Sequence, residues 1–181
     1  MKIAVYDIEC YPNILSLAVY LPKLGQTRTY EVSSRKNEWS KLHKFLFDLK
    51  SKDYYMVGFN NLGYDYPVLH AVLRLPSNAT AKEVVLTARS KSKEIIGGDF
   101  FNRNAHTIYG SRQMIPQIDL FKIWHFDRKG CSLKMLEFVM RQLDIQELPF
   151  DPNKRVHHDD LDQLLEYNRF DVANTWEFWL R

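Results

Sequence analysis

The sequence predicts a mixed α/β fold, in which helices cover a central sheet. Three observations predict it. Short apolar runs separated by turn residues open the chain, two more short apolar runs come later, and segments with helical spacing of apolar residues lie between and after them. The predicted order is three strands, a helix, a strand, a helix, a basic segment, a strand and two helices, which is typical of an α/β sheet domain.

The first three strands are predicted at residues 2–7, 14–21 and 27–32. Pro12 and Asn13 separate the first two, and a turn around Gly25 separates the second from the third. Turn residues between short apolar runs are typical of antiparallel hairpins. The sequence therefore predicts an antiparallel meander that feeds the rest of the sheet.

A helix, a buried strand and a second helix are predicted next. Apolar residues recur at helical spacing over 38–49, and a short apolar run follows at 54–59. After the loop at 60–63, residues 64–73 again show one apolar face, which places Asp65 in the first turn of a helix. Carboxylates are favourable there for electrostatic reasons alone, so this position does not by itself indicate function.

Residues 74–112 form a basic segment, with seven lysine and arginine residues against three acids. Thr80 and Glu83 have the spacing of a capping box, and we expect them to open a helix that ends before Gly97. A basic segment beside an acidic centre suits a bound polyanion, but a solvated helix face has the same composition.

The C-terminal third contributes one strand and two helices. The strand is predicted at 115–120 and ends in Asp119. Ser132 is expected to cap a helix over 133–143, with a loop at 144–156. Its apolar stripe comprises Leu133, Leu136, Val139, Met140 and Leu143. The last helix is predicted to begin near residue 159 and to bury Leu161, Leu164, Leu165 and Phe178.

Length and composition fit one soluble domain spanning residues 1–181, with the basic segment as an insertion at about 74–112. No apolar run approaches the roughly 18 residues that a membrane helix needs, and the first residues lack the pattern of a signal peptide. The cysteines, Cys10 and Cys131, have neither zinc-type spacing nor a disulfide framework. We therefore expect a reducing, cytoplasmic setting and no membrane partner.

Three acidic motifs carry the functional prediction. Asp7 and Glu9 alternate on one strand and share a face, Asp65 opens a helix, and Tyr167 and Asp171 lie four apart on the last helix. Four carboxylates are the hard oxygen ligands that a pair of Mg²⁺ or Mn²⁺ ions prefers. The sequence therefore predicts two divalent metal ions and the hydrolysis of phosphodiesters.

These motifs resemble those of the DEDD superfamily of 3′–5′ exonucleases, which have a ribonuclease H-like fold. Asp7-Ile8-Glu9 is similar to the first motif, Asn60 through Asp65 to the second, and Tyr167 through Asp171 to the third in its tyrosine variant. The second motif is most similar to the proofreading domains of family B DNA polymerases, particularly phage-type ones. Asp119 falls where those domains also have an acidic strand end.

The resemblance implies release of nucleoside 5′-monophosphates from the 3′ end of a single strand. It implies that Asp7 binds both metal ions and that Glu9 and Asp171 bind the ion that activates water. Asp65 is expected to act through the water shell of the second ion. Tyr167 is expected to orient the attacking water, because a phenol with a pKa near 10 is a poor base at neutral pH.

Five further residues are candidate contacts to the nucleic acid. Asn60 and Tyr64 resemble the single-strand contacts of the family, with an amide near the backbone and an aromatic ring stacked on the terminal base. Ile8 and Leu62 are candidate wedges between terminal bases, and Lys134 is a candidate phosphate contact. Packing roles for Tyr64, Ile8 and Leu62, and plain solvation for Lys134, are the alternatives.

DNA is favoured as the substrate, with RNA as the first alternative and a non-catalytic nucleic-acid-binding module as the second. An internal nuclease on branched DNA shares the carboxylates but not the spacing of Tyr167 and Asp171. Trp176 and Trp179 are three apart near the end of the chain and suit a core or an interface with a polymerase domain. Both a free-standing enzyme and a proofreading domain remain open, with a host-cytoplasmic location if the chain is phage-encoded.

Overall fold

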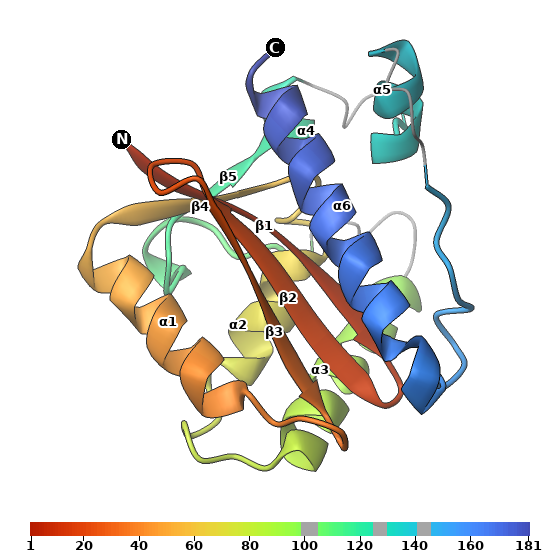
Figure 1. Ribbon diagram of the computed structural model, residues 1–181. Coiled ribbons are helices and arrows are strands. Elements are labelled where there is room, and N and C mark those ends of the chain that lie inside the picture. Colours follow the sequence, from red (N-terminus) through yellow and green to blue (C-terminus); the bar gives the residue numbers. More distant parts are fainter. Residues whose placement is uncertain (99–104, 125–129, 141–145) are drawn as a thin grey trace.

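The computed structural model describes residues 1–98, 105–124, 130–140 and 146–181. Five strands form one sheet in the order β3-β2-β1-β4-β5, with β1 at its centre (Figure 1). The strands are β1 (Lys2–Tyr11), β2 (Ile14–Leu21), β3 (Gln26–Ser33), β4 (Tyr54–Gly58) and β5 (Gln117–Asp119).

The sheet is mixed. β1, β2 and β3 pair antiparallel as the predicted meander, with Asp7 opposite Ala18. β4 pairs parallel with β1, and β5 parallel with β4, where Gly58 lies opposite Asp119. This order and these directions confirm the mixed α/β class and the ribonuclease H-like fold expected from the sequence.

Helices cover both faces of the sheet (Figure 1). α1, α2 and α3 pack on one face and α6 crosses the other. The helices are α1 (Trp39–Ser51), α2 (Asp65–Val72), α3 (Ala81–Ile96), α4 (Leu120–Ile123), α5 (Leu133–Val139) and α6 (Leu161–Trp179), with short 3-10 turns η2 (Gly110–Arg112) and η4 (His158–Asp160).

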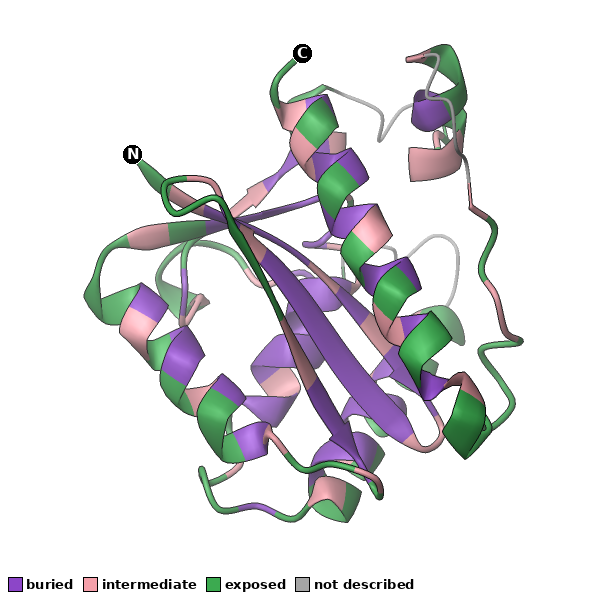
Figure 2. Ribbon diagram, viewed as in Figure 1, coloured by how far each residue is buried: buried purple, intermediate pink, exposed green. Residues whose placement is uncertain are grey.

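Side chains alternate across β1, which has a larger core on one face and a smaller core on the other, and a third apolar cluster surrounds Tyr11 and Ile14 where β1 meets β2. Tyr6, Ile8 and Cys10 point into the larger core beneath α1, α2 and α3. Val5 points into the smaller core beneath α6, and the carboxylates of Asp7 and Glu9 share that side because their positions also alternate with Tyr6 and Ile8. Figure 2 shows β1 and β2 buried along most of their length.

Two predicted boundaries were wrong. β1 extends to Tyr11, past the predicted end at Asp7, because its ladder with β2 continues to the pair of Tyr11 and Ile14. β5 covers Gln117–Asp119 and not the full predicted range 115–120, because the Asp119 side chain accepts a hydrogen bond from Phe121 N and caps α4, so Leu120 belongs to that helix. The sequence did not predict α4.

The helix after Ser132 is also different from its prediction. Ser132 caps α5 as expected, accepting a hydrogen bond from Met135 N. Within the described residues the helix ends at Val139, and the predicted residues 141–143 lie outside them. The predicted apolar stripe is wrong at Val139, whose side chain is 66% exposed, whereas Leu136 is buried in the second core.

The basic segment contains α3, and the capping box of Thr80 and Glu83 that opens it is confirmed. Val84 and Ala88 of this helix are fully buried in the larger core. Residues 99–104, including part of the predicted basic run, lie outside the described part of the chain.

Within the described residues, no helix is both long and apolar enough to cross a membrane. Cys10 and Cys131 are both free thiols. The cytoplasmic location expected from the cysteine content stays a prediction.

Candidate active site

Three of the predicted carboxylates meet where α6 crosses β1. Asp7 and Glu9 come from one face of β1, and Asp171 comes from the third turn of α6. One oxygen atom from each lies within 4.8 Å of the others, a spacing at which three carboxylates can bind one cation. Residues separated by more than 160 positions are therefore brought together by the packing of α6 on the sheet.

Asp65 lies beside this group, at the first residue of α2. Its Oδ1 accepts a hydrogen bond of 3.2 Å from Ile8 N, the residue between the two β1 carboxylates. This bond ties the start of α2 to the centre of β1. Asp65 lies outside the set of three oxygens within 4.8 Å, so the four predicted carboxylates form a group of three with a fourth at its edge.

Burial and mutual repulsion disfavour the charged forms of these carboxylates. Burial first, then the charges of Asp171 and Asp65, raises the pKa of Glu9 to about 8. Burial also raises the pKa of Asp65 to about 7 and holds the pKa of Asp7 well above its ordinary value, with Asp65 and Glu9 adding to the shift for Asp7. Hard oxygen donors that repel each other fit divalent cations such as Mg²⁺ or Mn²⁺.

Lys134 supplies an ammonium group next to the carboxylates. Its Nζ lies 3.0 Å from Asp171 Oδ1 and 3.9 Å from Glu137 Oε2. Among the described residues it is the cationic side chain that forms an ion pair with the predicted carboxylates. One positive charge does not balance four carboxylates, so the site keeps excess negative charge whenever these groups are ionised.

Tyr167 lies one turn before Asp171 on α6, so the two side chains share a face of the helix. Burial first, then the charge of Asp171, raises the pKa of the Tyr167 hydroxyl well above its ordinary value. The Lys134 ammonium lies 4.8 Å from the centre of the Tyr167 ring. The hydroxyl therefore remains protonated at neutral pH and can donate a hydrogen bond, but it is not a base.

Asn168 is a site residue that the sequence analysis missed. It is fully buried, and its Nδ2 donates a hydrogen bond of 2.6 Å to Asp7 Oδ2. Its Oδ1 accepts a hydrogen bond of 3.1 Å from the hydroxyl of Ser16 on β2. The pair of bonds fixes the orientation of the Asp7 carboxylate. Its position directly after Tyr167 could have indicated this role, although the asparagine side chain is not ionisable.

Asp119 holds the loop that precedes Asp65. Its carboxylate is 3% exposed and accepts hydrogen bonds from Asn60 N at 2.9 Å, Leu62 N at 3.0 Å and Phe121 N at 3.0 Å. Asn60 itself adopts a left-handed backbone conformation (φ 56°), which asparagine tolerates better than most residues. The acidic strand end identified in the sequence therefore shapes the second motif without joining the carboxylate group.

We expect Asp119→Ala to lower the free energy of unfolding by about 3 kcal/mol, because three backbone donors lose a charged acceptor. Urea denaturation would measure the change. Asp48→Ala is the matched control, since Asp48 forms a surface ion pair with Lys44 at 2.7 Å and its loss should change the stability far less. Equal effects of the two substitutions would contradict this role for Asp119.

The predicted nucleic-acid contacts divide into buried and accessible residues. Ile8 and Leu62 are 4% and 8% exposed, and this burial favours the packing role over the wedge role. Tyr64 is half-buried, and its hydroxyl lies 2.8 Å from Ser92 Oγ of α3. Asn60 is exposed at the turn between β4 and α2. Lys134 lies within the carboxylate group itself, through its bond to Asp171.

Comparison with known proteins gives information on the fold. No family model and no curated protein matches the sequence. Among solved structures, the chain is similar to the family B DNA polymerase from the hyperthermophilic archaeon Pyrobaculum calidifontis, with a TM-score of 0.52 and 15% sequence identity. The match covers 99% of this chain and 24% of the polymerase chain. At this level of identity the similarity establishes a shared fold with one part of a DNA polymerase.

Proposed function

We propose that this chain is a metal-dependent 3′–5′ exonuclease that hydrolyses single-stranded DNA ends to nucleoside 5′-monophosphates. The observation that carries the proposal is the group formed by Asp7, Glu9 and Asp171, whose oxygens lie within 4.8 Å of each other beside Asp65. Tyr167 on the same face of α6 completes the set of the tyrosine-type DEDD exonucleases that the motifs resemble.

Each residue has a distinct role in the proposed reaction. Asp7, Glu9 and Asp171 would hold the divalent ions, with Asp65 at the edge of the group acting through bound water. Bound Mg²⁺ or Mn²⁺ lowers the pKa of water and stabilises charge on the phosphate. Tyr167 would donate its hydroxyl proton in a hydrogen bond and orient the attacking water. Exposed Asn60 and half-buried Tyr64 would contact the terminal nucleotides.

DNA is preferred over RNA in this proposal. The fold is shared with part of a DNA polymerase. The residue pattern of the second motif resembles the corresponding motif of proofreading domains. The chain spans about a quarter of that polymerase chain, so a proofreading domain and a free-standing enzyme fit equally. An exoribonuclease with the same chemistry is the alternative.

Degradation of end-labelled oligonucleotides tests the proposal. Single-stranded DNA and RNA labelled at the 5′ end are incubated with the protein and Mg²⁺, Mn²⁺ or EDTA. We expect a ladder that shortens from the 3′ end in either metal and no cleavage in EDTA, with DNA cut faster than RNA. Nucleic-acid binding without cleavage in any metal would instead support a non-catalytic binding module.

We expect Tyr167→Phe to slow hydrolysis by about 10²-fold, the usual effect of a mispositioned reactant, while metal affinity stays near that of the wild type. The phenyl ring keeps its packing beside Lys134, and only the hydroxyl is lost. Single-turnover rates and Mn²⁺ titration calorimetry would measure the two quantities. A parallel loss of metal affinity would show that the hydroxyl supports the ligands rather than the water.

We expect Asn168→Ala to weaken Mn²⁺ binding by about 10- to 100-fold, because residues that orient metal ligands typically have effects of this size. Asn174→Ala is the matched control, since Asn174 is also a buried amide of α6 but donates to Glu137 Oε1 at 2.8 Å. Calorimetry on both variants separates ligand orientation from general loss of packing. Similar affinities in the two variants would contradict the role given to Asn168.

A further inference from the structure

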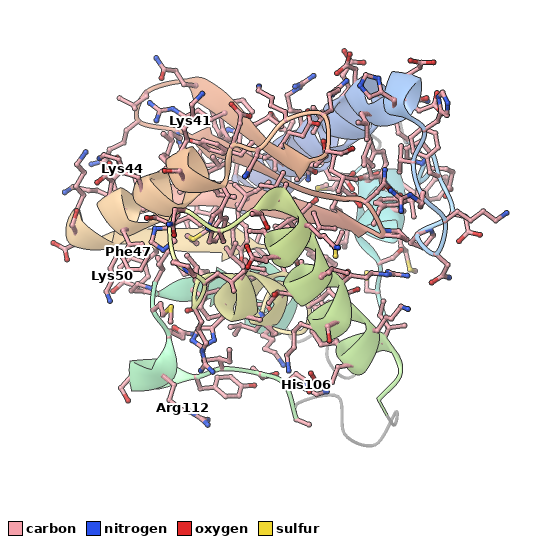
Figure 3. The ribbon with its side chains drawn as sticks, turned by 90° about the horizontal axis from the view of Figure 1, so that it is seen from below. Lys41, Lys44, Phe47, Lys50, His106 and Arg112 are labelled. Atoms are coloured by element: carbon pink, nitrogen blue, oxygen red, sulfur yellow. The ribbon has the colours of Figure 1, made fainter. Side chains whose placement is uncertain are left out.

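A pocket lies on the opposite face of the sheet from the carboxylate group. Its volume is about 950 Å³, and it is lined by the outer side of α2, by α3 and by the segment 105–114 (Figure 3). α2 and α3 pack on the core beneath Tyr6 and Ile8, whereas Asp7 and Glu9 face α6. None of the four candidate-site carboxylates lines the pocket. It is therefore separate from the proposed active site.

The lining carries more positive than negative charge. Arg74, Lys91 and Arg112 line it, against the single carboxylate of Glu94. Glu94 Oε1 lies 3.0 Å from Lys91 Nζ and 3.3 Å from His106 Nδ1, so its charge is already compensated. Within the ranges that the structure describes, the guanidinium groups of Arg74 and Arg112 have no carboxylate partner. Two arginines are thus available to an anion.

A buried hydroxyl in the lining also has an unused hydrogen-bonding capacity. Thr107 is 7% exposed, and its Oγ1 has no hydrogen-bond partner among the described residues. A buried polar atom without a partner is unfavourable and is uncommon in proteins. His70 of α2, which is 6% exposed, lines the same pocket. Because the hydroxyl oxygen of Thr107 has almost no accessible surface, a ligand in the pocket would not contact it directly.

The remaining lining is apolar and small. Pro67 and Ala71 of α2 contribute to it, together with Ala105, Ile108 and Met114 of the facing segment. A pocket of several hundred Å³ with an apolar wall and a few convergent polar groups is typical of small-molecule sites. Arginine matches phosphate geometry with two parallel hydrogen bonds, and an apolar wall accepts the face of a base.

We propose that this pocket binds a nucleotide through its phosphate group, with Arg74 and Arg112 as cationic partners. The ligand is either a free mononucleotide or one unit of a single strand, since both present the same phosphate and base. The proposal does not depend on the exonuclease activity, because it uses none of the residues of the carboxylate group.

Calorimetric titrations of the full chain test the proposal. They use the Asp7→Ala variant in EDTA, so that the carboxylate group neither cleaves nucleotides nor holds metal. The probes are dAMP, deoxyadenosine, inorganic phosphate and a 12-nucleotide oligo(dT). We expect dAMP to bind at least about tenfold more tightly than deoxyadenosine, because only dAMP carries the phosphate that the arginines recognise.

Two sets of pocket substitutions are compared in this background. Arg74→Gln combined with Arg112→Gln should weaken the binding of dAMP by about tenfold or more. Thr107→Val keeps the side-chain volume and should change the affinity for dAMP by less than about twofold, because the hydroxyl is inaccessible from the pocket. Thermal unfolding of each variant checks that it folds, and the two arginine side chains are exposed, so their replacement leaves the core unchanged.

The matched control combines Lys41→Gln with Lys50→Gln on the exposed side of α1, which removes the same charge away from the pocket (Figure 3). If the arginine substitutions weaken the binding of oligo(dT) as well as that of dAMP, the pocket binds a unit of a strand. If they weaken only the binding of dAMP, the ligand is a free nucleotide. Equal losses in the arginine and α1 variants, or no binding of any phosphate compound, would overturn the proposal. Absence of nuclease activity in the wild type would not affect it.

Discussion

Asp7→Ala is expected to lower the rate of 3′-end hydrolysis by at least about 10³-fold, because Asp7 is the carboxylate that would contact both metal ions. Its oxygen lies within 4.8 Å of oxygens of both Glu9 and Asp171, and its Oδ2 accepts a hydrogen bond from Asn168 Nδ2, so its carboxylate is held within the group. Single-turnover cleavage of 5′-labelled single-stranded DNA in Mg²⁺ would measure the effect. The overall fold should be retained, since Asp7 lies at the site and outside both apolar cores.

Two further variants make this prediction specific. Asp7→Asn should be as inactive as the alanine variant, because the amide fills the same space but lacks the charge needed for metal binding. Its melting temperature in EDTA at neutral pH should equal or exceed that of the wild type, since it removes a buried charge that Asp65 and Glu9 repel. Glu166→Gln, on an exposed position of α6, should keep the wild-type rate. More than a tenth of the wild-type rate in Asp7→Asn would contradict the proposed site.

Without divalent ions, the free energy of unfolding is expected to fall as pH rises from about 4.5 to about 8. The pKa of Glu9 is raised from 4.5 to about 8 in the folded state, so over this range the unfolded chain releases a proton that the folded chain keeps. Each unit of pKa difference corresponds to about 1.4 kcal/mol, and we expect a total loss of at least about 2 kcal/mol. Urea denaturation at several pH values in EDTA would measure it.

Glu9→Gln provides the control for this pH dependence. Burial lowers the pKa of His43 and of His70, which adds a slope of opposite sign below about pH 6.5. The difference between the wild type and Glu9→Gln removes that contribution. Mg²⁺ at about 100 times its dissociation constant should stabilise the wild type by about 2.7 kcal/mol, and it should stabilise Glu9→Gln much less. If the stability of the wild type relative to the variant does not fall between pH 5 and pH 8, the raised pKa of Glu9 is contradicted.

The sequence predicted the sheet well because local patterns determine its strands. Alternating apolar residues and turn residues mark the meander, and the capping box marks α3. Boundaries were wrong where a polar side chain bonds to the backbone. Asp119 reads as the polar end of an apolar run, whereas its hydrogen bond to Phe121 N begins a short helix. Whether such a side chain continues a strand or caps a helix depends on the donors around it, which lie elsewhere in the chain.

The site was predictable as a set of residue types but not as a geometry. The spacing of Asp7 and Glu9 indicated a shared face, and one oxygen of each lies within 4.8 Å of an Asp171 oxygen. The bond from Asn168 to Asp7 depends on the packing of α6 across β1 and β2, which no local pattern encodes. The same holds for the pocket around Thr107, because residues 105–114 have no periodicity and are positioned by contacts with α2, including the bonds of Met114 N and Ile115 N to the Tyr66 hydroxyl.

The alternation of β1 also has a consequence for how the protein folds. A shift of one residue between β1 and its neighbours would exchange its two faces, placing Asp7 and Glu9 in the larger apolar core and Tyr6 and Ile8 against α6. Two unpaired carboxylates in an apolar core are very unfavourable, so the acids penalise the misregistered sheet more strongly than the native one. The two acids that are proposed to bind metal therefore also disfavour a shifted register of β1. Recovery of metal-dependent activity after refolding would report that β1 has paired correctly.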